Sequence, residues 1–191
     1  MIQSNKIILA SESSRRKELL MLLGLKNIQC CKHKINENCF RFKKPLSKSV
    51  IKLAELKADS VNSVQKKKII IAGDTIVTRA GKVFNKVSSQ KEVKSYLKLL
   101  SGRKHFVYGG LCVISSQGKK FRRLIKTEVY FNKIEENDMT DEVLEDGIGK
   151  AGGYAIQNFG SRFIKKIRGC YTNIVGISIP ELYKIFRNPE F

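Results

Sequence analysis

The sequence predicts a single α/β domain, because segments with helical periodicity alternate with strand-like segments along the whole chain. The chain has 191 residues, of which 42% are hydrophobic, and only three are prolines. This length suits one domain, and this apolar fraction is sufficient for a hydrophobic core, which excludes a disordered basic tail. No linker, internal repeat or low-complexity tract divides the sequence, so we expect one domain over residues 1–191.

The elements follow from periodicity and from turn residues. Apolar runs between turn signals predict strands at residues 6–10, 69–77, 104–115, 121–134 and 162–167. Helical patterns, several ending at glycine, predict helices at residues 15–23, 47–64, 89–100, 138–145 and 180–186. Residues 26–46 are expected to be irregular or strand-like, and the glycine-rich residues 147–160 to form a loop.

Cysteine content and hydropathy predict a cytoplasmic protein. The five cysteines are an odd number, and the first residues contain no apolar signal core, so we expect free thiols in a reducing compartment. Charged residues interrupt every apolar run before it reaches the roughly 18 residues that a membrane span requires. We therefore expect no membrane partner.

The net charge of +20 invites a nucleic-acid partner, because basic surfaces attract polyphosphates. Lysine supplies 27 of the 37 basic residues, which an A/T-rich coding sequence explains equally well. Aromatic residues make up 8% of the chain, there is no Trp, and no aromatic cluster is expected on the strands. Because the base platforms of RNA-binding modules need such clusters, the sequence argues against a nucleic-acid partner.

Two arginines stand where a helix disfavours them. Arg15 and Arg16 begin the helix expected at residues 15–23, beside the positive end of its dipole. Together with the free helix amides and the hydroxyl of Ser11, they would form an anion-binding site. An exposed basic turn explains the same arginines equally well.

Two further charged residues interrupt apolar patterns. Lys57 falls in the middle of the apolar stripe of the helix at residues 47–64, so its ammonium must either reach solvent or meet a fixed anion. Asp74 interrupts the apolar run at residues 69–77 and is costly to bury unless it is paired or bound to a metal. A turn separating two strands is the alternative for Asp74, but apolar residues resume at once, which favours a functional carboxylate.

The glycine-rich stretch ends in Gln157, whose side-chain amide can pair with the edge of a base. This stretch lacks the spacing and the terminal Lys-Ser/Thr pair of a Walker loop. With the arginines, the lysine and the carboxylate, it nevertheless predicts a site for the phosphates of a nucleotide. A second cluster, formed by Cys30, Cys31, His33 and Cys39, matches no familiar zinc-finger spacing.

Six short motifs follow one another in order over nearly the whole chain: residues 8–20 (ILASESSRRKELL), 53–58 (LAELKA), 72–77 (AGDTIV), 100–105 (LSGRKH), 149–157 (GKAGGYAIQ) and 173–176 (NIVG). Together they resemble the motifs of the Maf family of nucleoside triphosphate pyrophosphatases, also called septum-formation inhibitors. The resemblance implies a Maf/inosine-triphosphatase-like two-lobed α/β fold, with a curved mixed sheet and a cleft between the lobes.

The resemblance also implies an activity. A nucleoside triphosphate would be hydrolysed to the monophosphate and pyrophosphate with a divalent cation, Mg²⁺ or Mn²⁺, in nucleotide-pool cleaning linked to cell division. Arg15, Thr75 and Gln157 match the positions that mark the family branch acting on dTTP and UTP. Asn158 stands where the family usually has glycine, which matters if that position needs a positive φ.

Roles for single residues are implied in the same way. Asp74 would act as general base for the attacking water and share the metal with Glu37, which matches the family's acidic position after the second strand. Charge on the triphosphate would be stabilised by Arg15, Arg16, Lys57 and Lys86, and Ser11 would donate to a phosphate oxygen. Thr75 and Gln157 would contact the pyrimidine or its surroundings.

Two other classes of function stay open at this point. One is a regulator of septum formation that binds nucleotides but has lost catalysis, and the other is a basic nucleic-acid-binding protein. The resemblance leaves a homodimer open as well.

Overall fold

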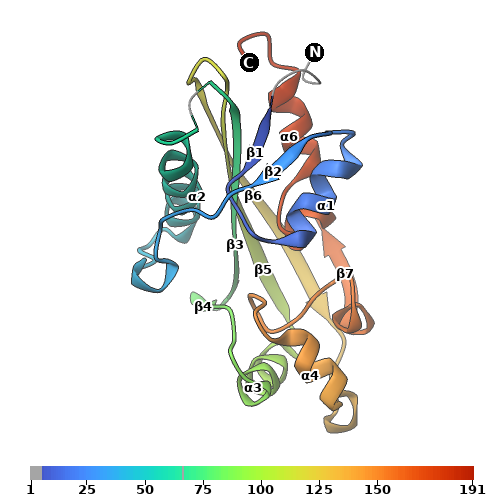
Figure 1. Cartoon of the computed structure of the whole chain (residues 1–191). Helices are drawn as coiled ribbons and strands as arrows, with labels where there is room; N and C mark the ends of the chain where they lie inside the picture. The colour runs from blue at the N-terminus through green and yellow to red at the C-terminus, as the bar shows by residue number, and fades with distance from the viewer. Residues whose placement is uncertain (1–5, 66) are drawn as a thin grey trace. The chain divides into compact units, whose positions relative to one another are not determined.

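A computed structural model describes residues 6–65 and 67–191, so residues 1–5 and Lys66 of the expected domain lie outside the described residues. The chain forms a seven-stranded sheet with the order β2-β1-β3-β5-β6-β7, and β4 pairs with β3 (Figure 1). The strands are β1 Ile7–Leu9, β2 Ile28–Cys30, β3 Ile69–Arg79, β4 Lys82–Phe84, β5 Lys104–Ile114, β6 Lys120–Phe131 and β7 Ile164–Arg168. The sheet is mixed, because β1 pairs in parallel with β2 and β3, whereas the β3–β4 and β6–β7 pairs are antiparallel.

The helices confirm the predicted α/β class. They are α1 Ser14–Leu22, α2 Leu46–Asn62, α3 Gln90–Leu100, α4 Asp141–Gly147, α5 Tyr171–Val175 and α6 Ile179–Phe186, with 3-10 turns η2 Glu37–Cys39, η3 Glu136–Asp138 and η4 Phe159–Phe163. The short helix α5 was not expected from the sequence. The predicted helix at residues 138–145 begins three residues later, because Glu135 and Asp138 form a capping box around η3 instead.

Two compact units make up the chain. The first unit comprises Met1–Asp74, Gly109–Ile125 and Gly176–Phe191, and the second comprises Thr75–Tyr108 and Lys126–Val175. The long strands β3, β5 and β6 each contribute residues to both units. In the described residues, no helix is long and apolar enough to cross a membrane. All five cysteines are free thiols.

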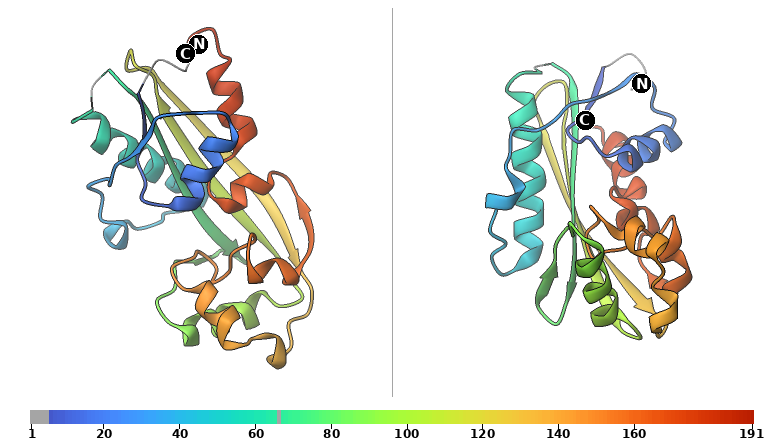
Figure 2. Two further views of the ribbon diagram at one scale, coloured as in Figure 1. Left: turned by 45° about the vertical axis from the view of Figure 1, so that its right-hand side comes forward. Right: turned by 60° about the horizontal axis from the view of Figure 1, so that its bottom comes forward.

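The core of the first unit lies between α2 and the parallel strands. Helix α2 covers one face of the sheet in this unit, and α1 and α6 lie on the other face (Figures 1 and 2). Small and β-branched side chains fill the α2 interface, among them Ile8, Ala10, Ala54, Ala58, Ile70 and Ala72. Because side chains alternate along a strand, the residue that follows Ala72 by two positions points towards α2 as well. That residue is Asp74.

An aromatic cluster forms part of the core of the second unit, where α3 and α4 pack against each other (Figure 2). The ring of Phe131 contacts His105, Tyr154 and Phe163. His105 is completely buried, its Nε2 lies 2.8 Å from the Tyr154 hydroxyl, and burial lowers the pKa of its imidazole to about 4. His105 therefore serves the core, as a neutral hydrogen-bonding group.

The expectation that no aromatic side chains cluster on the strands is wrong. Phe106 and Tyr108 of β5 have ring centroids 6.2 Å apart. The ammonium of Lys104 lies over the rings of both Phe106 and Tyr130, which stands on the neighbouring strand β6. These aromatic residues are too far apart in sequence to be recognised as a cluster until the pairing of the strands is known.

Candidate active site

A buried lysine between two carboxylates is the centre of the candidate site. The side chain of Lys57 is only 1% exposed, and its Nζ donates to Asp74 Oδ1 at 2.6 Å and to Glu37 Oε1 at 2.8 Å. Asp74 is buried as well, whereas Glu37 is partly exposed. Removing a lysine ammonium from water is costly unless anions compensate its charge, and here two of them do.

The sequence places this lysine and its partners by simple periodicities. Lys57 belongs to the buried stripe of α2, together with Leu53, Ala54, Ala58 and Val61, so its stem packs against the sheet. Strand β3 continues without interruption from Ile69 to Arg79, which excludes the alternative of a turn at Asp74. The sequence left two outcomes open for the ammonium of Lys57, which were to reach solvent or to meet a fixed anion. The structure shows the second outcome.

The parallel strands explain why residues distant in sequence meet here. Strands β2, β1 and β3 run in the same direction, so their carboxyl ends lie at one edge of the sheet. Ser11 follows β1, Glu37 follows β2, and Asp74 lies beyond the parallel-paired part of β3. Ligand sites of open α/β sheets lie outside the carboxyl ends of such strands.

Arg16 joins this group from the first turn of α1. Its Nη1 donates to Ser11 Oγ at 3.2 Å and its Nε donates to the carbonyl of Gly176 at 3.2 Å. The pKa of its guanidinium is lowered, mainly by desolvation. The charges of Asp74 and Glu37 oppose this shift, and the charge of Arg15 adds to it. Gly176 has a φ of +146°, and a Cβ there would lie 3.1 Å from the Arg16 side chain, so glycine is needed for this approach.

The start of α1 lacks groups that would oppose an anion. Ser13 is the N-cap residue and makes no side-chain capping bond, and the first turn contains no acidic residue. The hydroxyl of Ser11 accepts from the Ser13 amide at 3.3 Å, and Arg15 is partly exposed beside Arg16. Ser11, Arg15 and Arg16 therefore lie together, whereas an isolated exposed basic turn would leave Arg16 without its buried serine partner.

The remaining predicted residues lie in the second unit. Lys86 is exposed, and its backbone forms a bridge with Ala151 in the glycine-rich stretch, while the Gly149 amide donates to the Val87 carbonyl at 2.8 Å. The structure thus brings Lys86 and this stretch together. Gln157, at the end of the stretch, is exposed, and Thr75 is partly buried on β3.

Asn158 does not disturb the backbone in the way the family comparison suggested. Its φ is −118°, so the position does not require the left-handed conformation that glycine would supply. Its side-chain amide donates to Asp146 Oδ1 at 2.8 Å. Asn158 therefore fits this backbone and ties it to Asp146.

The family model for Maf-like proteins matches residues 6–189. The chain belongs to the Maf-like protein family. A relative from Syntrophus aciditrophicus, named dTTP/UTP pyrophosphatase, is 34% identical over 97% of this chain and 90% of its own length. A relative of the same name from Clostridium tetani is 38% identical over 94% of this chain and 95% of its own length.

Among solved structures, a HAM1 protein from Coxiella burnetii aligns with a TM-score of 0.43 and 18% identity, over 69% of this chain and 73% of that chain. At this level of similarity it adds nothing to the family assignment, which rests on the sequence.

The carboxylates have the chemistry that a Mg²⁺ or Mn²⁺ ion requires. Asp74 and Glu37 supply hard oxygen donors that converge on one point, the ammonium of Lys57. Among the described residues, no group of three or more His, Cys, Asp or Glu side chains is placed to hold an ion. Since Mg²⁺ usually takes one or two protein carboxylates and completes its shell with water and substrate phosphates, this donor set fits a cation that arrives with a nucleotide.

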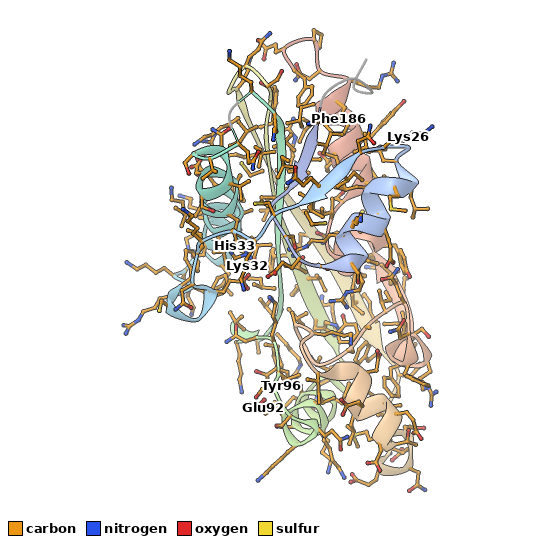
Figure 3. The ribbon with its side chains drawn as sticks, viewed as in Figure 1. Lys26, Lys32, His33, Glu92, Tyr96 and Phe186 are labelled. Carbon is orange, nitrogen blue, oxygen red and sulfur yellow. The ribbon has the colours of Figure 1, made fainter. Side chains whose placement is uncertain are left out.

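His33 is the residue at this site whose role the sequence did not predict. Its Nε2 lies 3.2 Å from Glu37 Oε1, the oxygen that also accepts from Lys57. Figure 3 labels His33 next to Lys32, in the segment that follows β2. Because an ionised carboxylate only accepts hydrogen bonds, Nε2 carries the proton in this contact. A separation of four residues was the available signal, but the intervening segment is not helical until η2, so periodicity could not reveal it.

A pocket of about 470 Å³ lies elsewhere in the first unit. It is lined by Lys17, Met21, Gly24, Leu25, Lys26, Asn27 and Ile28. None of these residues belongs to the candidate site, so this pocket and the chemistry do not coincide.

Proposed function

We propose that this chain hydrolyses nucleoside triphosphates, dTTP and UTP among them, to the monophosphate and pyrophosphate. The observation that carries the proposal is the buried Lys57 between Asp74 and Glu37, at the carboxyl edge of three parallel strands. The names of the relatives supply the substrate class, since two of them are called dTTP/UTP pyrophosphatases.

The triphosphate would be held by the basic residues of the first unit. Arg15 and Arg16 stand at the amino end of α1, and the hydroxyl of Ser11 faces Arg16. A polyphosphate is favoured by guanidinium groups, by helix amides and by the helix dipole at the same place. We assign Lys86 to the triphosphate as well, and Thr75 and Gln157 to the pyrimidine base.

The chemical step is attack of water on the α-phosphorus. A new P–O bond forms, the bond from the α-phosphorus to the bridging oxygen breaks, and pyrophosphate leaves with the bridging oxygen. Asp74 accepts the proton of the attacking water. Lys57 uses two N–H groups for Asp74 and Glu37, so its third N–H can be directed at a phosphate oxygen.

A divalent cation, Mg²⁺ or Mn²⁺, would be held by Asp74 and Glu37 together with substrate oxygens. When bound, it neutralises phosphate charge and lowers the barrier to loss of pyrophosphate. The two carboxylates supply the negatively charged oxygen donors that favour its recruitment.

Substitution of Asp74 by Asn tests the proposal. Asn keeps the shape of the side chain and an oxygen that accepts from Lys57, so the protein should fold, while the general base is lost. We expect pyrophosphate release from dTTP to fall by at least about 100-fold, the usual contribution of a positioned base. The measurement is pyrophosphate release with Mg²⁺ or Mn²⁺ over a panel of canonical and modified triphosphates, with the melting temperature recorded in parallel.

Asp59→Asn is the matched control, because Asp59 also belongs to the α2 region but pairs with Lys120 on the sheet. Its turnover should match that of the unchanged protein. Undiminished turnover in Asp74→Asn would remove Asp74 from the mechanism. Nucleotide binding without pyrophosphate release from any triphosphate would instead favour the regulator of septum formation.

A further inference from the structure

An exposed face of the second unit combines aromatic rings with cations. Phe106 and Tyr108 on β5 and Tyr130 on β6 are half-buried, and their rings lie among exposed Lys and Arg side chains. Lys126 Nζ is 4.3 Å and Lys104 Nζ 5.3 Å from the Phe106 ring centre. We call this surface the aromatic face, formed by Lys104, Phe106, Tyr108, Lys126, Glu128, Tyr130, Lys166 and Arg168.

The third strand completes the face. Strand β7 pairs with β6 in the register Tyr130 with Lys166 and Glu128 with Arg168. Arg168 lies over the Tyr130 ring at 5.8 Å, and Lys104 lies over the same ring at 5.9 Å. The Phe106 ring and the Tyr130 ring are thus each flanked by cations from two strands.

Positive charge exceeds negative charge on this face. Glu128 is its one acidic member. The hydrogen bond from the Tyr130 hydroxyl is the main cause that lowers the pKa of the Glu128 carboxyl group, and the charges of Lys104, Arg168 and Lys126 lower it further. One carboxylate therefore balances only part of a field produced by several cations. The remaining positive potential suits a ligand that brings several negative charges in a row.

We propose that the aromatic face binds single-stranded nucleic acid. Bases stack on aromatic rings of a sheet while lysine and arginine side chains neutralise the phosphates between them, which is the chemistry of general single-strand binding. The lysine groups that now lie over the rings are long and exposed, so they can move aside to the phosphates as bases take their place. This inference is independent of the proposed hydrolysis.

Charge and surface composition favour this partner over others. A second copy of the chain would bring a further +20 charge to the interface, which opposes self-association through this face. An acidic protein segment matches the cations but has no regular use for the aromatic rings. A duplex offers phosphates, but its bases are stacked on one another and cannot stack on Phe106 or Tyr130.

The experiment measures binding of a fluorescein-labelled oligothymidylate of about 12 nucleotides by fluorescence anisotropy. The unlabelled competitors are a duplex of equal length and polyglutamate. With about four phosphates neutralised, affinity should fall roughly 50-fold as salt rises from about 50 to about 200 mM. An excess of pyrophosphate, which would occupy the candidate active site, should not displace the oligonucleotide.

Matched variants separate the aromatic face from general charge. Lys166→Glu changes the aromatic face, whereas Lys91→Glu makes the same charge change at an exposed position on helix α3 of the same unit. We expect Lys166→Glu to weaken binding several-fold more than Lys91→Glu. The double variant Phe106→Leu/Tyr130→Leu keeps apolar bulk but removes ring faces, and should weaken binding at least about 5-fold.

Four results would overturn the proposal. Equal weakening by Lys91→Glu and Lys166→Glu would reduce binding to overall charge, and so would an unchanged affinity in the double leucine variant. Stronger competition by the duplex would exclude stacking, and stronger competition by polyglutamate would assign the face to an acidic protein. Pyrophosphate release from dTTP should be unchanged in Lys166→Glu, so failure of this proposal and failure of the hydrolase proposal are read separately.

Discussion

At the scale of single residues, the buried ammonium of Lys57 depends on carboxylates that compensate its charge. Lys57 has two carboxylate partners, so the loss of one still leaves the other. Removing a single partner from a buried ion pair typically costs about 3–5 kcal/mol. The arrangement therefore leaves the Lys57 side chain with one carboxylate partner while the other carboxylate is engaged by substrate or cation.

His33 acts at the same scale as a positioning residue for Glu37. In His33→Leu the N–H donor to Glu37 Oε1 is lost, and we expect kcat/KM for dTTP to fall about 10-fold, because hydrogen bonds to charged groups contribute about 1.5–3 kcal/mol. His33→Gln retains a side-chain N–H and should restore much of the rate. Steady-state kinetics with pyrophosphate detection measures both variants.

A double-mutant cycle distinguishes positioning from a merely structural role. In a Glu37→Gln background, His33→Leu should cause little further loss, because the contact through which it acts is already changed. An equal loss in both backgrounds would show that His33 does not act through Glu37.

Residues that break a pattern could be predicted from the sequence, and residues held only by tertiary contacts could not. Lys57 and Asp74 were conspicuous because each interrupts an apolar repeat, whereas Glu37 was found only through the family resemblance. Helix α5 escaped prediction because it is five residues long and is held by Asn173, which donates to the Val107 carbonyl and to Thr127 Oγ1. Those partners lie more than 40 residues away in sequence.

At the scale of elements, the glycine-rich stretch is fixed against the segment that carries Lys86. The Gly152 amide donates to the Phe84 carbonyl at 3.1 Å, and its φ is +77°. A Cβ at this position would lie 2.9 Å from the Val77 side chain. Both the backbone conformation and the space therefore demand glycine.

A comparison with Gly149 separates the requirement for a positive φ from the requirement for space. Its φ is +75°, but a Cβ there would meet no atom within 4 Å. Gly149→Ala should cost about 1 kcal/mol through backbone strain alone. Gly152→Ala should cost at least about 1 kcal/mol more, because it also overpacks Val77.

Urea denaturation of both variants measures the difference in the free energy of unfolding. Val77→Ala in the Gly152→Ala background should recover part of the loss, since it removes the methyl groups that the new Cβ meets. Equal destabilisation of the two alanine variants would mean that the close contact with Val77 contributes nothing.

At the scale of the whole molecule, the positive charge has three components. A few basic residues gather at the candidate active site, and others form the aromatic face, while the remainder is distributed over the surface. With 37 basic against 17 acidic residues, cations outnumber carboxylates about two to one. Mutual repulsion of these cations weakens the compact state at low ionic strength.

The melting temperature should therefore rise with salt. Repulsion extends over about 30 Å at 0.01 M ionic strength but only about 8 Å at 0.15 M, so NaCl added in this range should stabilise the folded chain and have less effect beyond it. The triple variant Lys48→Gln/Lys91→Gln/Lys165→Gln replaces exposed lysines and lowers the net charge by three. It should melt at a higher temperature than the unchanged protein in low salt, and the difference should shrink as NaCl is added. A melting temperature that falls with NaCl would show that surface ion pairs, such as those of Glu136 with Lys94 and Lys98, outweigh the net repulsion.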